Sequence, residues 1–585
     1  MTEFDYRIVK DPQVYAQNTL PPHSDHIPFA PEDRPENMQT SLRRSLNGMW
    51  RFHYAENYRS APDGFWKDDF DVSGWTEIPV PSNMQMEGYD KPAYVNTQYP
   101  WDGLEPIEPG QIPERHNPVG QYVRTFRLPD GWKQDSVRIS FQGVESGFAL
   151  WLNGRYVGYA EDSFTPSEFD LTPFLQDGEN RAAVLVFKWT AGSWCEDQDM
   201  YRFSGIFRDV YLERIPKVHL EDVKILADYQ AEESAGLLDV TLKLTGNVSG
   251  AAVGYRLEKL GVLENLEDQK EGEEIKAGRI CAAGDETHLF NGEQPLELYI
   301  QEKLDDPLAW SAEIPNLYRL SLTLEKDGEL VETVRELVGF RHFEMKEGLM
   351  CLNGKRIVFR GVNRHEFSCD TGRKPNPDEI LRAVTIMKQN HINAVRTCHY
   401  PDASILYRLC DIFGIYMIAE NNMETHGMWD RVGRHQIGIE QALPGDRTEW
   451  EPMMISRIRS MVELEKNHPA ILIWSCGNES FGGSVIWHMA QEFRRLDGSR
   501  LVHYEGIRND RRYPDTSDME SQMYTPVREV EAFLKEHPEK PFILCEYSHS
   551  MGNSNGGLFK YTDLTKREPR YQGGFIWTSL TRQSV

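Results

Sequence analysis

Cysteine is scarce in this sequence, and the few cysteines form no metal-binding or redox motif. Eight cysteines are scattered over 585 residues without CxxC spacing, and most of them sit inside apolar runs. Such positions are typical of small buried side chains. The first residues, MTEFDYRIVK, contain no apolar segment of a secretory signal. We therefore expect an intracellular, cytoplasmic protein.

Long hydrophobic runs and positive net charge are also missing. No uninterrupted apolar stretch approaches the ~18 residues of a membrane span, so we expect no membrane segment. The formal net charge of −27 disfavours binding to nucleic acid or to an anionic membrane surface. The sequence has no glycine-rich phosphate loop, so no nucleotide or organic cofactor is expected.

The sequence does contain three regions with different patterns of predicted secondary structure. Residues 1–217 carry short alternating strands punctuated by turn residues, as in a β-sandwich or jelly roll. Residues 218–336 form a second β-rich region whose length suits an immunoglobulin-like β-sandwich. From residue 337 to 585 strands alternate with helices, and eight apolar strand candidates over roughly 250 residues predict a (β/α)8 TIM barrel. The candidates read RIVFRG, AVRTCH, YMIAEN, ILIWSCGNE, LVHYEG, SQMYT, FILCEY and GGFIW.

Polar residues crowd the carboxyl ends of most of these strands. In a TIM barrel those ends form the floor of the active site. One such residue could be a structural polar group, but a series of them on successive strands favours a shared cleft. The residues are Asn363, Arg364, His365, Arg396, His399, Asn422, Glu424, His426, Asn478, Glu479, Tyr524, Glu546 and His549.

Two of the strands end in a glutamate, Glu479 after ILIWSCGN and Glu546 after FILC. These are the fourth and seventh strands, which lie across the barrel mouth from each other. Two carboxyl groups at one site are typical of glycosidic bond cleavage, in which one protonates the leaving oxygen and the other attacks or activates water. Each glutamate could instead pair with a barrel arginine such as Arg360 or Arg396. Spacing alone leaves both interpretations open.

Several long motifs carry a family resemblance. RGVNRHE (360–366), NAVRTCHYP (393–401), METHGM (423–428), SCGNES (475–480), CEYSHSMGNS (545–554) and EDQDMYRFSGIFRDV (196–210) resemble the β-galactosidases of glycoside hydrolase family 2. The similarity extends from the amino-terminal region nearly to the last residue. It implies a jelly roll, an immunoglobulin-like sandwich and a TIM barrel, in that order. It also implies a retaining exo-glycosidase acting on terminal β-D-galactose, with β-glucuronidases and β-mannosidases as the nearest alternatives.

The resemblance assigns expected roles to individual residues. Glu479 resembles the general acid/base and Glu546 the nucleophile. Asn478 is similar to the residue that binds the sugar 2-hydroxyl, a contact that strengthens in the transition state. The other positions that resemble sugar-contacting residues are Asn96, Asp199, His365, His399, Tyr524, His549 and Trp577.

Metal ions are implied by the same resemblance. Glu424, His426 and Glu479 match a magnesium site, and Asp199 matches a sodium ligand. Magnesium prefers oxygen ligands and keeps several waters, so one histidine among carboxylates is tolerable. A cation at Glu479 should lower the pKa of that residue, whereas the nearby Glu546 should raise it.

The carboxyl end departs from the family pattern. After Trp577 the family continues Trp-Asp-(Trp or Phe)-Val-Asp-Gln, whereas this chain reads TSLTRQSV. Deletion of a single base after the tryptophan codon would convert the family pattern into Thr578–Ser584, so we expect a frameshift. This implies a truncated chain that lacks the end of the barrel and two further β domains, and an inactive fragment is an alternative function. The resemblance implies a homo-oligomer for a full-length protein.

Overall fold

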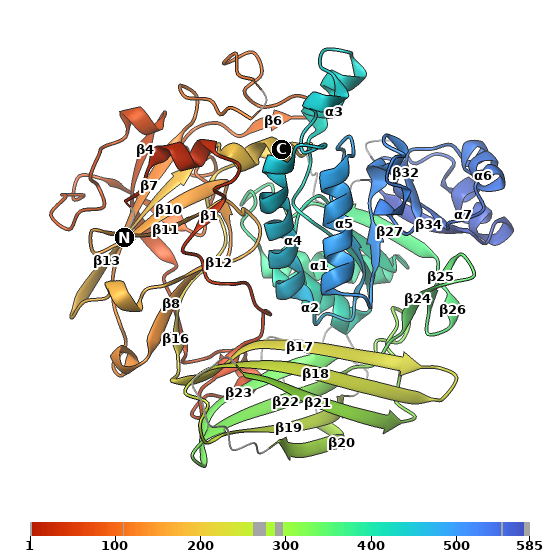
Figure 1. Ribbon diagram of the computed structural model, residues 1–585, viewed down its shortest axis with the longest axis horizontal. Helices are drawn as coiled ribbons and strands as arrows, with labels where there is room; N and C mark the ends of the chain where they lie inside the picture. Colours follow the sequence, from red (N-terminus) through yellow and green to blue (C-terminus); the bar gives the residue numbers. More distant parts are fainter. Residues whose placement is uncertain (1–2, 109, 261–276, 287–295, 551–553, 578–585) are drawn as a thin grey trace.

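The structure, a computed structural model, describes residues 3–108, 110–260, 277–286 (backbone only), 296–550 and 554–577. Figure 1 shows a β-rich unit at the start of the chain, a second β-sandwich beside it, and a unit of alternating strands and helices that contacts both. The fold class expected from the sequence is confirmed. The hypothesis of a frameshift falls on residues 578–585, which lie outside the described residues.

The first unit is a sandwich of two antiparallel sheets that bury a shared apolar core. The larger sheet runs, in spatial order, β1 (Ala16–Gln17), β11 (Arg155–Ala160), β10 (Gly147–Leu152), β13 (Glu179–Phe187), β7 (Val119–Arg127), β4 (Gly48–Ala55) and β5 (Thr76–Val80). The smaller sheet runs β12 (Ser167–Asp170), β8 (Ser136–Phe141), β16 (Val210–Ile215) and β3 (Arg43–Ser45). Two short pairs complete the unit: β6 (Ala93–Val95) with β14 (Met200–Arg202), and β9 (Val144–Glu145) with β15 (Gly205–Ile206).

The second unit is a smaller sandwich, in which inward apolar residues alternate with outward polar ones along each long strand. One sheet comprises β17 (Val218–Gln230), β18 (Ala235–Gly246) and β21 (Leu296–Asp305). The other comprises β2 (Pro28–Phe29), β23 (Glu329–Val338), β22 (Tyr318–Lys326), β19 (Ala251–Leu260) and β20 (Ala277–Glu286). Because β2 comes from the start of the chain, the amino-terminal segment joins the first unit to the second.

Eight parallel strands form the barrel, and all eight candidates from the sequence are among them. They are β27 (Phe359–Arg364), β28 (Ala394–Thr397), β29 (Tyr416–Glu420), β30 (Ile471–Ser475), β31 (Leu501–His503), β32 (Glu520–Met523), β33 (Phe542–Tyr547) and β34 (Tyr571–Ile576). β27 pairs with both β28 and β34, so the first and last strands meet. The described strands β31 and β32 do not pair with each other, so the ring is nearly closed. A small sheet of β24 (Phe343–Lys346), β25 (Leu349–Leu352) and β26 (Lys355–Arg356) precedes the barrel.

Helices cover the outside of the ring. They are α1 (Pro377–Gln389), α2 (Ser404–Phe413), α4 (Glu451–Glu465), α5 (Ser484–Leu496), α6 (Val527–Glu536) and α7 (Leu558–Arg567). A further helix, α3 (His426–Gly433), projects beyond the ring after the loop that carries Glu424 (Figure 1). Short 3-10 turns, η10 (Glu505–Arg508) and η11 (Pro514–Thr516), stand between β31 and β32. In the described residues, no helix combines the length and the apolar character needed to cross a membrane.

A groove of about 1200 Å³ runs along β27, β34 and α7. Its lining includes the apolar side chains of Val358, Tyr561 and Ile576. Phe559, on α7, is 64% exposed. Among the described residues, this groove borders the outer surface of the seam between the first and last strands.

Candidate active site

Glu479 reaches the barrel mouth through a backbone turn that only glycine permits. Gly477, two residues before it, has φ of +142°, and a Cβ there would lie 2.4 Å from the carbonyl oxygen of Met423. The Asn478 amide donates to the same carbonyl over 2.9 Å. This close approach aligns the SCGNES segment with the loop that carries Glu424. Glu479 therefore lies against that loop rather than in solvent.

Glu546 is buried on β33 and is held by two donors. Arg396 Nη1 donates to its Oε1 over 3.0 Å, and Tyr524 Oη donates to its Oε2 over 3.0 Å. Burial raises the pKa of Glu546 to about 8; Arg396 opposes this rise, and the charge of Glu479 adds to it. The two glutamates are thus close enough for their charges to interact, as the positions of the fourth and seventh strands predict.

Arg396 is fully buried and donates to four side chains at once, one of which is Asn363, through its Oδ1 over 3.1 Å. Besides Glu546 it donates to Glu420 through Nε and Nη2, both over 2.8 Å, and to Asn478 Oδ1 over 2.9 Å. Burial opposes ionisation of Glu420, but Arg396 and His399 outweigh it and lower the pKa of this carboxyl to about 2. Glu546 therefore does pair with a barrel arginine, and it does so at the site where it faces Glu479.

Aromatic rings gather beside the two glutamates. Trp577 is buried, and the His399 ring stacks on it with centroids 5.2 Å apart and planes 12° apart. His365 meets Trp577 edge-on at 5.5 Å, and His549 lies 6.4 Å from it. His399 Nδ1 donates to Glu420 over 2.7 Å, which fixes the orientation of the ring. The residues predicted at the ends of four different strands thus form one wall.

The first unit also contributes to the site. Glu196 forms a parallel bridge with Glu424, and the Glu424 amide donates to the carbonyl of Cys195 over 2.9 Å. Asp199 follows on the same segment and accepts a hydrogen bond from Tyr94. The pairing of Met200 with Val95 places Asn96, which is exposed, near Asp199.

Glu424, His426 and Glu479 each offer one ligand atom, and these atoms lie within 4.8 Å of one another. His426 Nδ1 is 2.7 Å from Glu479 Oε2 and 3.8 Å from Glu424 Oε1, yet it and Glu424 Oε1 are buried without a hydrogen bond. Burial and the charge of Glu479 raise the pKa of Glu424 well above its usual range. Two carboxylates and one histidine with unused atoms fit a divalent cation that keeps water ligands.

All predicted site residues lie in the described part of the chain, and the structure brings them to one end of the barrel. Two further residues were not selected from the sequence. Glu420 ends the apolar strand YMIAE and reads as part of the core, although a carboxylate at such a strand end is itself a signal. Glu505 is buried beyond β31 with Oε1 lacking a partner, and burial followed by the charge of Glu479 raises its pKa to about 8.

Comparison with known proteins decides the family. Residues 43–216 match the sugar binding domain of Glycosyl hydrolases family 2, residues 218–341 match Glycosyl hydrolases family 2, and residues 343–584 match its TIM barrel domain. The β-galactosidase large subunit of Latilactobacillus sakei is 42% identical over 97% of this chain and 89% of its own length. The chain belongs to glycoside hydrolase family 2.

Other relatives within the family are longer. The β-galactosidase of Halalkalibacterium halodurans is 47% identical over 97% of this chain, but this chain covers 54% of it. The chain thus spans about half the length of such curated relatives. Among solved structures, β-glucuronidase 2 of Bacteroides uniformis has a TM-score of 0.73 at 19% identity, covering 92% of this chain and 64% of that one. That likeness supports the family fold alone.

Proposed function

We propose that this chain carries the catalytic site of a retaining exo-β-galactosidase, which removes terminal β-D-galactose from lactose-like galactosides. The observation that carries the proposal is the pair Glu479 and Glu546 on opposite strands of the barrel, with Glu546 held by Arg396 and Tyr524. Galactose is favoured because curated relatives at 42–47% identity are β-galactosidases.

The geometry supports distinct roles for the two glutamates. Glu546 attacks the anomeric carbon while Glu479 protonates the leaving oxygen, which gives a covalent glycosyl-enzyme. Once Glu546 is an ester its negative charge is gone, and Glu479, which gave up its proton in the first step, becomes the base that activates water. Asn478, whose amide is oriented by Arg396 and Glu424, would bind the sugar 2-hydroxyl.

The remaining predicted residues would shape the sugar pocket. The Trp577 face, with His399 stacked on one side, offers a flat apolar surface for a pyranose ring. His365 and His549 border this ring, and Asn96 and Asp199 would contact the sugar from the first unit.

The charges around the site argue against β-glucuronidase activity. A glucuronide carries a carboxylate that needs a cationic partner, and Arg396 beside the two glutamates is already held by Glu420 and Glu546. Hydrolysis rates of p-nitrophenyl β-galactoside, β-glucuronide and β-mannoside test the choice. The galactoside should exceed both others by about 100-fold or more in kcat/KM, since a site built for one hydroxyl pattern rejects others strongly. A preference for the glucuronide or the mannoside would overturn it.

We also propose Mg²⁺ at Glu424, His426 and Glu479, and Na⁺ at Asp199. A bound Mg²⁺ would supply positive charge beside Glu479. The convergence of ligand atoms from Glu424, His426 and Glu479 within 4.8 Å of one another supports the first assignment. Dialysis against chelator followed by MgCl2 should restore activity in the wild type but not in Glu424→Gln; equal activity with and without Mg²⁺ would contradict the assignment.

The assembly is a separate proposal. The open groove along β27, β34 and α7 and the relatives named large subunits favour a protein in which further chain, in the same or another polypeptide, covers the barrel seam. We propose that such a longer protein forms a homo-oligomer. We also propose a cytoplasmic location, which buried free thiols such as Cys398 and Cys476 support. Sedimentation of a full-length protein would test whether it forms a homo-oligomer.

A further inference from the structure

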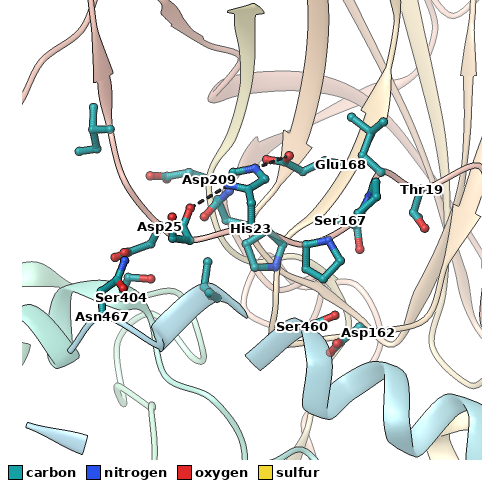
Figure 2. A pocket seen from close by; sticks show the side chains of 18 of the residues that line it. Thr19, His23, Asp25, Asp162, Ser167, Glu168, Asp209, Ser404, Ser460 and Asn467 are labelled. Carbon is teal, nitrogen blue, oxygen red and sulfur yellow. Dashed lines mark hydrogen bonds and ion pairs between the residues drawn. The ribbon is translucent and has the colours of Figure 1, made fainter. Parts of the chain in front are cut away.

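A second pocket lies where the amino-terminal segment, the second sandwich and the barrel meet. It has a volume of about 410 Å³, and it is lined by side chains from all three, among them Asp25, Glu336, Ser404 and His468. Figure 2 shows Asp25 on the amino-terminal segment, on the side of this pocket where Ser404 and Asn467 lie. The pocket is separate from the residues of the candidate active site.

Three potential metal ligands converge at this junction. Asp25, Glu465 and His468 each offer one ligand atom, and these atoms lie within 4.8 Å of one another. His468 Nε2 is 3.1 Å from Glu465 Oε2 and 3.5 Å from Asp25 Oδ2. Glu465 is fully buried and His468 is 8% exposed, yet neither Glu465 Oε2 nor His468 Nε2 makes a hydrogen bond. These two buried atoms thus lie within ion-pair distance of each other, and together with Asp25 they face a common space.

The other atoms of these side chains are already engaged. Glu465 Oε1 accepts from Ser404 Oγ over 3.0 Å, and His468 Nδ1 donates to Asp411 Oδ2 over 2.5 Å. Asp411 is itself fixed, because its Oδ1 accepts from the Ala470 amide over 2.9 Å. A carboxylate on Nδ1 leaves the lone pair on Nε2, which is how metal-binding histidines are oriented.

The charge at the junction also favours a cation. Asp25, Glu336, Asp411 and Glu465 are packed around His468, and Arg408 is the basic side chain that interacts with Asp25 and Glu336. Buried carboxylates that repel one another are unfavourable unless positive charge is supplied. The four carboxylates outnumber Arg408 and His468, the two side chains there that can carry positive charge.

We propose that Asp25, Glu465 and His468 bind a divalent transition-metal ion, Mn²⁺ or Zn²⁺, with water from the pocket completing its coordination. One imidazole nitrogen and two carboxylate oxygens suit these ions better than Ca²⁺, which takes oxygen ligands only. Asp25 belongs to the amino-terminal segment, whereas Glu465 is the last residue of α4 and His468 follows three residues later. The ion therefore links the barrel to the amino-terminal segment, which itself joins the two sandwiches.

Anomalous diffraction locates the ion directly. Crystals of the metal-stripped 585-residue chain are soaked in MnCl2 or in ZnCl2, and data are collected at the absorption edge of the metal. We expect a peak between Glu465 Oε2, His468 Nε2 and Asp25. Peaks confined to the Glu424 and His426 site, or none at the junction, would overturn the proposal and indicate that a protonated His468 balances the carboxylates instead.

Stoichiometry in solution provides the matched test. Wild type should bind one more equivalent of Mn²⁺ than Glu465→Gln. Glu463→Gln, the control, makes the same charge change two residues away on α4 and should bind as much Mn²⁺ as wild type. Asp25→Asn, at a partly exposed position, serves where Glu465→Gln does not fold. Asp411→Asn should weaken the junction site by about 10–100-fold through its effect on His468. Equal stoichiometry in wild type and in the Glu465 and Asp25 variants would contradict the site.

Discussion

Arg396 donates to Glu546 over 3.0 Å while both side chains are almost completely excluded from solvent. The arginine is not dedicated to this glutamate, because it is also held by Glu420 on the neighbouring strand. Its guanidinium is thereby fixed in one orientation before any substrate arrives. The position of the proposed nucleophile is therefore determined by a buried charge network.

Arg396→Lys should remove most activity although the charge is kept. A lysine is a point charge and cannot reproduce the donors to Glu420, Glu546 and Asn478. Breaking one partner out of such a buried network costs about 3–5 kcal/mol of unfolding free energy. Arg360→Lys, at an exposed position in the same barrel, is the control. Chemical denaturation and turnover of an aryl galactoside measure both effects; a stable, active Arg396→Lys protein would show that the network does not position Glu546.

Glu546→Gln and Glu479→Gln should fail in different ways. Loss of the nucleophile lowers kcat for every substrate by about 10⁴-fold or more. Loss of the general acid slows substrates with poor leaving groups by about 10²–10⁴-fold but spares the first step for activated aryl galactosides. Azide should restore turnover to Glu479→Ala and yield a β-linked galactosyl azide. Retained activity of Glu546→Gln towards activated substrates would mean that the roles are reversed.

Removing Glu479 and removing the Tyr524 hydroxyl should shift the acid limb of the pH profile of kcat/KM in opposite directions. Burial and then the charge of Glu479 raise the pKa of Glu546 to about 8, and the hydrogen bond from Tyr524 lowers it. Because Glu546 attacks only when ionised, kcat/KM falls as pH drops below that pKa. Glu479→Gln should move this acid limb to lower pH and Tyr524→Phe should move it to higher pH, both with a dinitrophenyl galactoside. Shifts of the same sign would contradict the assigned electrostatics.

A chain extended past the eighth strand should be more active than residues 1–585. The groove along β27, β34 and α7 exposes apolar surface next to the strand that leads to Trp577. Catalytic groups need positioning within about 0.5 Å, and an uncovered strand is free to open locally. We expect little turnover of o-nitrophenyl β-galactoside and strong binding of a hydrophobic dye by residues 1–585, and the reverse for a chain extended to the length of the longer curated relatives. Equal turnover per active site would show that the barrel works without that cover.

Much of the fold follows from local pattern. ILIWS and FILCEY are apolar runs that only a strand buried on both faces explains, and β30 and β33 lie where the pattern places them. The pairing of Pro28–Phe29 with β23 was not foreseen, because a two-residue strand in a proline-rich segment has no periodicity. The domain boundaries at residues 217 and 336 stay predictions.

The candidate site was predictable at the strand ends and not inside them. Glu479 and Glu546 stand out because a carboxylate ends an apolar run, whereas Glu420 looked like the last residue of a core strand. Its importance depends on Arg396 and His399, which approach from β28 and from the loop after it, and sequence spacing does not encode such contacts between strands. The same holds for Asp25 and Glu465, which are 440 positions apart and meet only in the folded chain.

Covalent trapping tests the central claim most directly. A 2-deoxy-2-fluoro-β-D-galactosyl fluoride should inactivate the longer form of the protein by forming a stable ester. The fluorine at C2 slows both formation and hydrolysis of the glycosyl-enzyme, and the activated fluoride leaving group keeps its formation fast enough for the ester to accumulate. Mass spectrometry of a proteolytic digest should place the fluorogalactosyl group on Glu546, in the peptide that contains FILCEY. The account predicts labelling of Glu546 in step with the loss of activity. Labelling of Glu479, or an active enzyme that forms no adduct and releases α-galactose first, would contradict it.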